Sequence, residues 1–282
     1  MDASSKTPGG FSLNDLLPKG QPNIVNLLSM TLSWRMGRSA FTGDISQFYN
    51  AVLLSSEFWQ YQKILLKENL DINSATEIAI ILTLIYGVTS VSGQSEEVVK
   101  LLANYIEDKY PEIYKLLIDE RYVDDFGKST MSDETSDNLI KKATEVLGMV
   151  GMKVKGWTVS GRDPPEKVSE DGQSVGFAGK TWFPKADIFK LHIQSLHFSK
   201  KKRGAYPKGL VKFDEAKMSF EEYTPKNLNR RQCTGVVSRI YDPEGLLTPI
   251  TLKCKNDLRQ LIKFEPSKIE QIFLVLYYIL RV

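Results

Sequence analysis

The chain has 282 residues, of which 42% are hydrophobic and 25% are charged. This length fits one large domain or two smaller ones, and the hydrophobic share supports a sizeable core, which excludes a chain that is disordered throughout. The formal net charge is only +3, so any basic surface that binds nucleic acid must be local.

Neither the cysteines nor the apolar segments indicate secretion or membrane insertion. Cys233 and Cys254 are too few for a disulfide or metal framework and are typical of a reducing compartment. Residues 1–10 lack a signal-peptide pattern, and the apolar run at 272–280 is shorter than the ~20 residues that cross a bilayer. We expect a protein of the cytoplasm or nucleus with no membrane partner. Both ends look arbitrary, which suggests a piece of a longer chain.

The first third of the chain changes from loop to helix to strand. Prolines and glycines mark the loop, helical spacing of apolar residues marks the helix, and alternation or β-branched runs mark the strands. The predicted elements are a loop at 8–22, a helix at 23–34, a strand at 39–45, a short helix or turn at 47–54, and a strand at 77–86.

The middle of the chain predicts two longer helices around an acidic turn. Residues 95–110 place apolar side chains on one face, which predicts an amphipathic helix. Residues 120–130 predict two short strands joined by a tight turn, and Ser132 is a suitable cap for a helix over 133–149. Further strands are predicted at 153–159, 174–182 and 187–193.

A composition shift at 199–209 marks a predicted domain boundary. Four consecutive basic residues, Lys200 to Arg203, are followed there by glycine and proline. We therefore divide the chain into a larger domain at 1–198 and a smaller, mostly helical region at 199–282. The basic run has three open interpretations: phosphate contact, a solvated loop, or a nuclear import signal.

Three aspartates form the central chemical signal. Asp124 and Asp125 are adjacent in a predicted turn, where their like charges repel each other unless a cation neutralises them. Asp44 comes at the end of another predicted strand. Three such carboxylates can hold two Mg²⁺ ions ~3.5–4 Å apart. The alternative for the adjacent pair alone is an ordinary polar turn.

Six blocks of sequence, in order, resemble motifs of the reverse transcriptase region of BEL/Pao-type retrotransposon polyproteins. Together they extend over roughly residues 1–262. The blocks are the opening segments 2–7 and 12–15, the first metal-binding motif at 41–49 (FTGDISQFY), the nucleotide-contacting motif at 86–90 (YGVTS), the double-aspartate motif at 121–125 (RYVDD), the primer-grip region at 179–182 (GKTW), and the element after the polymerase at 241–249 (YDPEGLLTP).

The resemblance implies an α+β fold of the right-hand polymerase palm type, an antiparallel sheet backed by helices. Partial fingers would belong to residues 1–198, and a truncated connection or thumb-like subdomain to 199–282. The basic finger strands of the family are expected before residue 1. The family lysine falls at Gly156, which leaves Lys155 or Lys153 as a general acid toward pyrophosphate, with a solvated strand lysine as the alternative.

The resemblance also implies roles for individual residues. Catalysis and metal binding would fall to Asp44, Asp124 and Asp125. Incoming nucleotide would contact Tyr49, Tyr86 and Gly87, with the Tyr49 ring excluding a ribose 2′-hydroxyl. Template and primer would contact Tyr122, Lys180 and Trp182.

The implied activity is RNA-directed DNA polymerase, a nucleotidyltransferase of a transposable element. The implied cofactors are two Mg²⁺ ions, with Mn²⁺ as a substitute. The implied partners are an RNA or DNA template with primer, and deoxynucleoside triphosphates. The RNase H and integrase parts of such a polyprotein are missing from this chain.

Two other functions are weighed. The first is a truncated, inactive retroelement remnant that at most binds nucleic acid. The second is an aspartic peptidase, which needs Asp-Thr/Ser-Gly loops; the sequence contains no such tripeptide. His192 and His197 are five residues apart on a predicted strand, so they face opposite sides and do not predict a shared metal.

Overall fold

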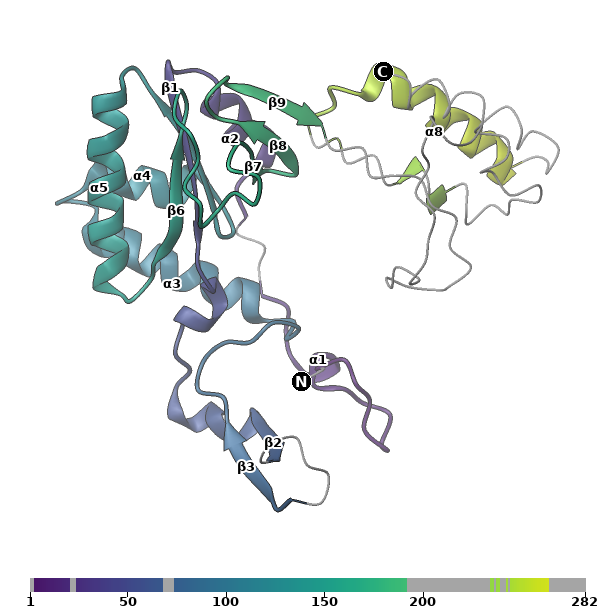
Figure 1. Cartoon of the computed structure of the whole chain (residues 1–282). Coiled ribbons are helices and arrows are strands. Elements are labelled where there is room, and N and C mark those ends of the chain that lie inside the picture. Colours follow the sequence, from purple (N-terminus) through teal and green to yellow (C-terminus); the bar gives the residue numbers. More distant parts are fainter. Residues whose placement is uncertain are drawn as a thin grey trace. The chain divides into compact units, whose positions relative to one another are not determined.

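The computed structural model describes residues 3–20, 24–67, 74–191, 234–235, 237–238, 242 and 244–263. The chain divides into two compact units, the first made of Met1–Ala178 with Trp182–Ile188 and the second of Gly179–Thr181 with Phe189–Val282. Its antiparallel sheets and separate helices make it an α+β protein, as predicted (Figure 1). The predicted boundary at 199, both histidines, Cys233 and the basic run lie outside the described residues.

The first unit is built on a four-stranded sheet with the strand order β4-β5-β1-β6. β1 (Ser39–Ile45) pairs antiparallel with both β5 (Asp125–Thr130) and β6 (Val154–Val159), and β4 (Arg121–Tyr122) forms a tight hairpin with β5. Strands were predicted at each of these places. The central strand β1 is therefore held on both edges.

Three helices cover one face of this sheet and form the main core with it (Figure 1). They are α3 (Val91–Ile106), α4 (Pro111–Asp119) and α5 (Asp133–Met149). The predicted cap of α5 is present, since the Ser132 hydroxyl accepts the Thr135 N–H at 3.2 Å. Side chains from odd positions of β1, such as Phe41 and Ile45, are buried against these helices.

The opposite face of the sheet is partly covered by α2 (Leu27–Trp34). Trp34 is buried, and its indole N–H donates to the Phe41 carbonyl at 3.0 Å. Its ring also packs against Phe177 and Trp182, with ring centroids 4.5 and 4.8 Å away. This aromatic cluster fixes α2 and strand β7 (Val175–Phe177) to the sheet.

Some predicted elements differ from the structure for local reasons. The loop at 8–22 contains one helical turn, α1 (Leu13–Leu16), because Ser12 and Asp15 form a reciprocal capping box. The strand at 174–182 is split into β7 and β8 (Lys180–Phe183) because Ala178 and Gly179 both have a positive φ. The helix α4 was not predicted; it begins at Pro111, a residue well suited to the first helical position.

The remaining elements are not part of the four-stranded sheet. β2 (Lys63–Lys67) and β3 (Thr76–Ile80) form a two-stranded antiparallel sheet, and β3 ends earlier than the predicted end at residue 86. The other elements are the 3₁₀ helices η1 (Phe48–Ala51) and η2 (Ser56–Tyr61), the strand β9 (Ile188–Leu191) and the helix α8 (Thr248–Lys263).

Candidate metal centre

Asp44 and Asp125 lie directly opposite each other on neighbouring strands. The register of β1 and β5 pairs these two residues, so both side chains leave the same face of the sheet. That face is opposite to the one on which Phe41 and Ile45 pack against the helices. Like charges in such a cross-strand pair repel each other. The fold therefore places two acids in a cross-strand pair, a position where two opposite charges or two apolar side chains would be more favourable.

Asp124 completes the cluster from the hairpin turn between β4 and β5. One carboxylate oxygen from each of Asp44, Asp124 and Asp125 lies within 4.8 Å of the other two. The turn is tied to β1 because the Ile45 N–H donates to the Asp124 carbonyl at 2.9 Å. All three side chains are half-buried. The predicted site residues of this group are thus brought together.

The electrostatics of the cluster favour a bound cation. Burial, followed by the charges of Asp124 and Asp44, raises the pKa of Asp125 to about 7. Burial and then Asp124 also raise the pKa of Asp44, and Lys155 opposes this shift. A divalent cation would lower these pKa values by neutralising the repulsion. Carboxylate oxygens are hard ligands, so the donor set fits Mg²⁺ or Mn²⁺.

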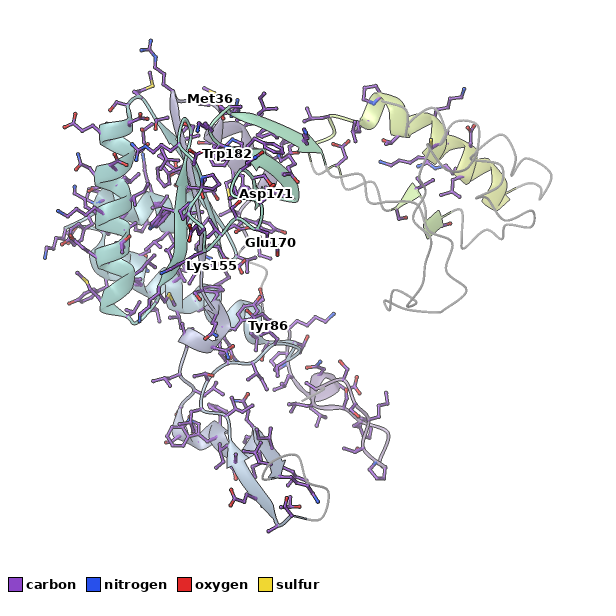
Figure 2. All side chains as sticks on the ribbon, viewed as in Figure 1. Met36, Tyr86, Lys155, Glu170, Asp171 and Trp182 are labelled. Carbon is purple, nitrogen blue, oxygen red and sulfur yellow. The ribbon has the colours of Figure 1, made fainter. Side chains whose placement is uncertain are left out.

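A polar cleft of about 160 Å³ adjoins the cluster on the open face of the sheet. Asp44 and Asp125 line it together with Thr42, Thr158 and Lys155 from the same sheet. Lys155, labelled in Figure 2, comes from β6 and is exposed, and its charge acts on Asp44. The cleft thus combines acidic ligands with one nearby cation.

Gly43 explains how the strand that carries Asp44 packs so tightly. A Cβ at this position would lie 2.5 Å from Cε3 of Trp157 on β6. The Trp157 ring instead fills that space and packs edge-on against Phe41 and tilted against Phe126. Its indole N–H donates to the Thr144 hydroxyl on α5 at 3.0 Å. The glycine before Asp44 therefore serves the packing behind the site.

Two tyrosines lie beside the acidic cluster. Tyr49, from η1, and Tyr86 form an edge-to-face ring pair with centroids 4.8 Å apart. Burial, followed by the charge of Asp124, raises the pKa of Tyr86, although the residue is 61% exposed. Figure 2 labels Tyr86 on the segment that follows β3. This pair could form the wall of a ligand site next to the carboxylates.

Gly87 has a positive φ of 92°, and the segment around it is fixed by Asn14. The Asn14 amide donates to the Gly87 carbonyl at 2.8 Å, and its oxygen accepts the Thr89 N–H at 2.8 Å. Sequence reasoning gave Asn14 no role beyond the opening block. An asparagine can satisfy both a donor and an acceptor, but the sequence does not indicate which distant backbone groups it will meet.

The three residues expected at template and primer have different environments. Tyr122 is half-buried on β4 and pairs with Asp125 in the strand register. Trp182 is 0% exposed, and its indole N–H donates to Asp187 at 3.1 Å. Lys180, in the second unit, is buried in an ion pair with Glu244. Lys180 and Trp182 are therefore both buried and expose little side-chain surface.

An ion pair that the sequence did not reveal lies behind the hairpin turn. Arg121 and Glu96 are both buried, and the Arg121 Nη2 lies 2.6 Å from the Glu96 Oε2. A signal for it exists in the sequence, because Glu96 interrupts the apolar stripe that Val99, Ala103 and Ile106 form on α3. A charge on such a face indicates a buried partner, but the partner itself is 25 residues away.

No family model matches this chain, and no curated protein gives a significant match. Within the described part of the chain, none of the helices is both long and apolar enough to cross a membrane.

Proposed function

We propose that this chain is the catalytic region of an RNA-directed DNA polymerase that uses two divalent metal ions. The observation that carries the proposal is the convergence of Asp44, Asp124 and Asp125 within 4.8 Å. Two features support it: the polymerase-like motifs follow one another in the order expected of a reverse transcriptase, and an antiparallel sheet with helices on one face carries the acids on its other face. A polymerase palm is expected to have this arrangement.

The three aspartates would hold the metal ions through their carboxylate oxygens. Metal ions held there would supply the positive charge that activates a primer 3′-hydroxyl and neutralises the leaving pyrophosphate. Asp44 and Asp125 sit on paired strands, which fixes the spacing between them. Asp124 approaches from a turn hydrogen-bonded to β1. This chain would thus supply a prearranged set of ligands rather than a nucleophile of its own.

The tyrosine pair would bind and select the incoming nucleotide. Tyr49 lies five residues after Asp44, and its ring is held edge-on by Tyr86. A ring fixed under the sugar would leave no room for a 2′-hydroxyl, which would favour deoxynucleotides over ribonucleotides. Of the two candidate lysines, Lys155 lines the cleft beside Asp44, so we assign it the contact with the triphosphate.

The direct test is primer extension on an RNA template with Mg²⁺ and deoxynucleotides. Asp124→Asn should reduce the extension rate by at least about 100-fold, because it removes a ligand charge from the metal centre. Asp137→Asn is the matched control, since it removes an exposed carboxylate that pairs with Arg162 on the surface. Equal extension by the wild type and Asp124→Asn would contradict the proposal. A folded wild type that extends no primer would favour the inactive remnant.

A further inference from the structure

The hairpin turn that carries Asp124 has an unfavourable backbone conformation. Val123 has a φ of +58°, in the left-handed region that β-branched residues rarely occupy. A residue remains in such a conformation only when the structure around it supplies compensating contacts. Those contacts should therefore lie close to Val123.

Arg121 provides one such contact, in addition to the packing of Val123 against the core. Its guanidinium donates through Nη1 to the Val123 carbonyl and through Nε to the Leu117 carbonyl at 3.2 Å. It also lies over the Phe48 ring, with its Cζ 5.5 Å from the ring centroid. The same side chain therefore contacts the turn, α4 and η1 from a buried position.

Glu96 fixes the orientation of this guanidinium. The two side chains form a two-pronged pair, with Nη1–Oε1 at 3.0 Å and Nη2–Oε2 at 2.6 Å. They are only 4% and 7% exposed. A buried ion pair contributes little net stability relative to apolar packing, so geometry is a better reason for its presence. A two-pronged contact fixes the guanidinium in a single plane.

The conformation of this turn sets the distance between Asp124 and Asp44. Asp124 follows Val123 directly, and its carbonyl accepts the N–H of Ile45, the neighbour of Asp44. A shift of the Val123 carbonyl would move Asp124 relative to Asp44 while leaving the paired strands β1 and β5 in register. Three contacts thus connect Glu96 to the acidic cluster. They are its ion pair with Arg121, the hydrogen bond from Arg121 to the Val123 carbonyl, and the hydrogen bond from the Ile45 N–H to the Asp124 carbonyl.

We propose that Glu96 and Arg121 are positioning residues, which hold the left-handed turn at Val123 and so keep Asp124 at the metal-binding distance. Their purpose rests on the proposed two-metal function, but their effect on the turn does not. Neither residue touches the metal ions or the substrate in this account.

The test compares Glu96→Gln and Arg121→Lys with the wild type in two measurements. The first is Mn²⁺ affinity by electron paramagnetic resonance, which should weaken about tenfold in each variant, as is typical when a residue behind a metal ligand is removed. The second is hydrogen exchange in the peptide that contains the Ile45 amide, which should become faster. Arg121→Lys keeps the charge of the pair and serves if Glu96→Gln does not fold.

A rescue separates positioning from general destabilisation. Glycine adopts a positive φ without strain, so adding Val123→Gly to Glu96→Gln should restore Mn²⁺ affinity to within about threefold of the Val123→Gly single variant. Asp137→Asn breaks the exposed, two-pronged pair with Arg162 and should change neither measurement.

The outcomes distinguish this inference from the proposed function. Unchanged Ile45 exchange and unchanged Mn²⁺ affinity in both single variants would overturn the positioning role, even if primer extension were lost. A wild type that binds no Mn²⁺ would contradict the proposed function. The rate of hydrogen exchange at the Ile45 amide would then decide the positioning role by itself.

Discussion

Asp125 determines how the protein should respond to pH. Partial burial and the nearby charges of Asp124 and Asp44 raise the pKa of Asp125 in the folded chain to about 7, well above the ordinary aspartate value of 3.8. Between these two values the folded chain binds more protons than the unfolded chain. The stabilising contribution is therefore complete below pH about 4 and is lost as the pH rises through about 7.

We predict that the metal-free protein loses thermal stability as the pH rises from about 4 to about 7 and that saturating Mg²⁺ reverses this loss, because the metal binds the ionised carboxylates. Asp125→Asn should flatten the pH dependence of the melting temperature, since asparagine does not titrate. Differential scanning calorimetry across this range measures both effects. The same slope in the wild type and Asp125→Asn would show that another group is responsible.

Tyr49 offers a second prediction at the scale of one residue. Tyr49→Val should raise the incorporation of ribonucleotides relative to deoxynucleotides by at least about tenfold, equivalent to ~1.4 kcal/mol, because it removes the ring expected to exclude the 2′-hydroxyl. Single-nucleotide incorporation with each substrate gives this ratio. Tyr105→Val is the control, since Tyr105 is 86% exposed on α3. An unchanged ratio in Tyr49→Val would rule out the selecting role.

At the scale of elements, the parts of the site that depend on local signals could be predicted. The alternating pattern of residues 39–45 predicted β1, and the sequence of 120–130 predicted the hairpin of β4 and β5. The capping residue Ser132 predicted the start of α5. The parts that depend on tertiary packing could not. The pairing of Glu96 with Arg121 and the burial of Trp182 both arise only when distant elements meet.

The packing of β1 against β6 gives a prediction about stability. Gly43→Ala should destabilise the fold by about 1–3 kcal/mol, because its methyl group would collide with the Trp157 ring. Gly148→Ala is the contrasting change: Gly148 lies within α5, and among the described residues an added Cβ would point into open space, so alanine should stabilise by about 0.5–1 kcal/mol. Urea denaturation measures both values. A stabilising Gly43→Ala would contradict the packing described here.

At the scale of the whole molecule, the first unit contains every residue assigned to metal and nucleotide in the proposed function. Asp44, Asp124, Asp125, Tyr49, Tyr86 and Gly87 all belong to it. Lys180 belongs to the second unit and is paired with Glu244 there. The proposed chemistry therefore lies within the first unit, and metal binding requires no residue of the second.

We propose that three aspartates of the first unit hold two metal ions. The most direct measurement is electron paramagnetic resonance of the full chain titrated with Mn²⁺, in the presence of primer–template and a non-hydrolysable deoxynucleoside triphosphate. We expect two bound ions whose spin coupling corresponds to a separation of ~3.5–4 Å, and loss of that coupling in Asp44→Asn but not in Asp137→Asn. Uncoupled ions, or coupling that survives Asp44→Asn, would contradict the account.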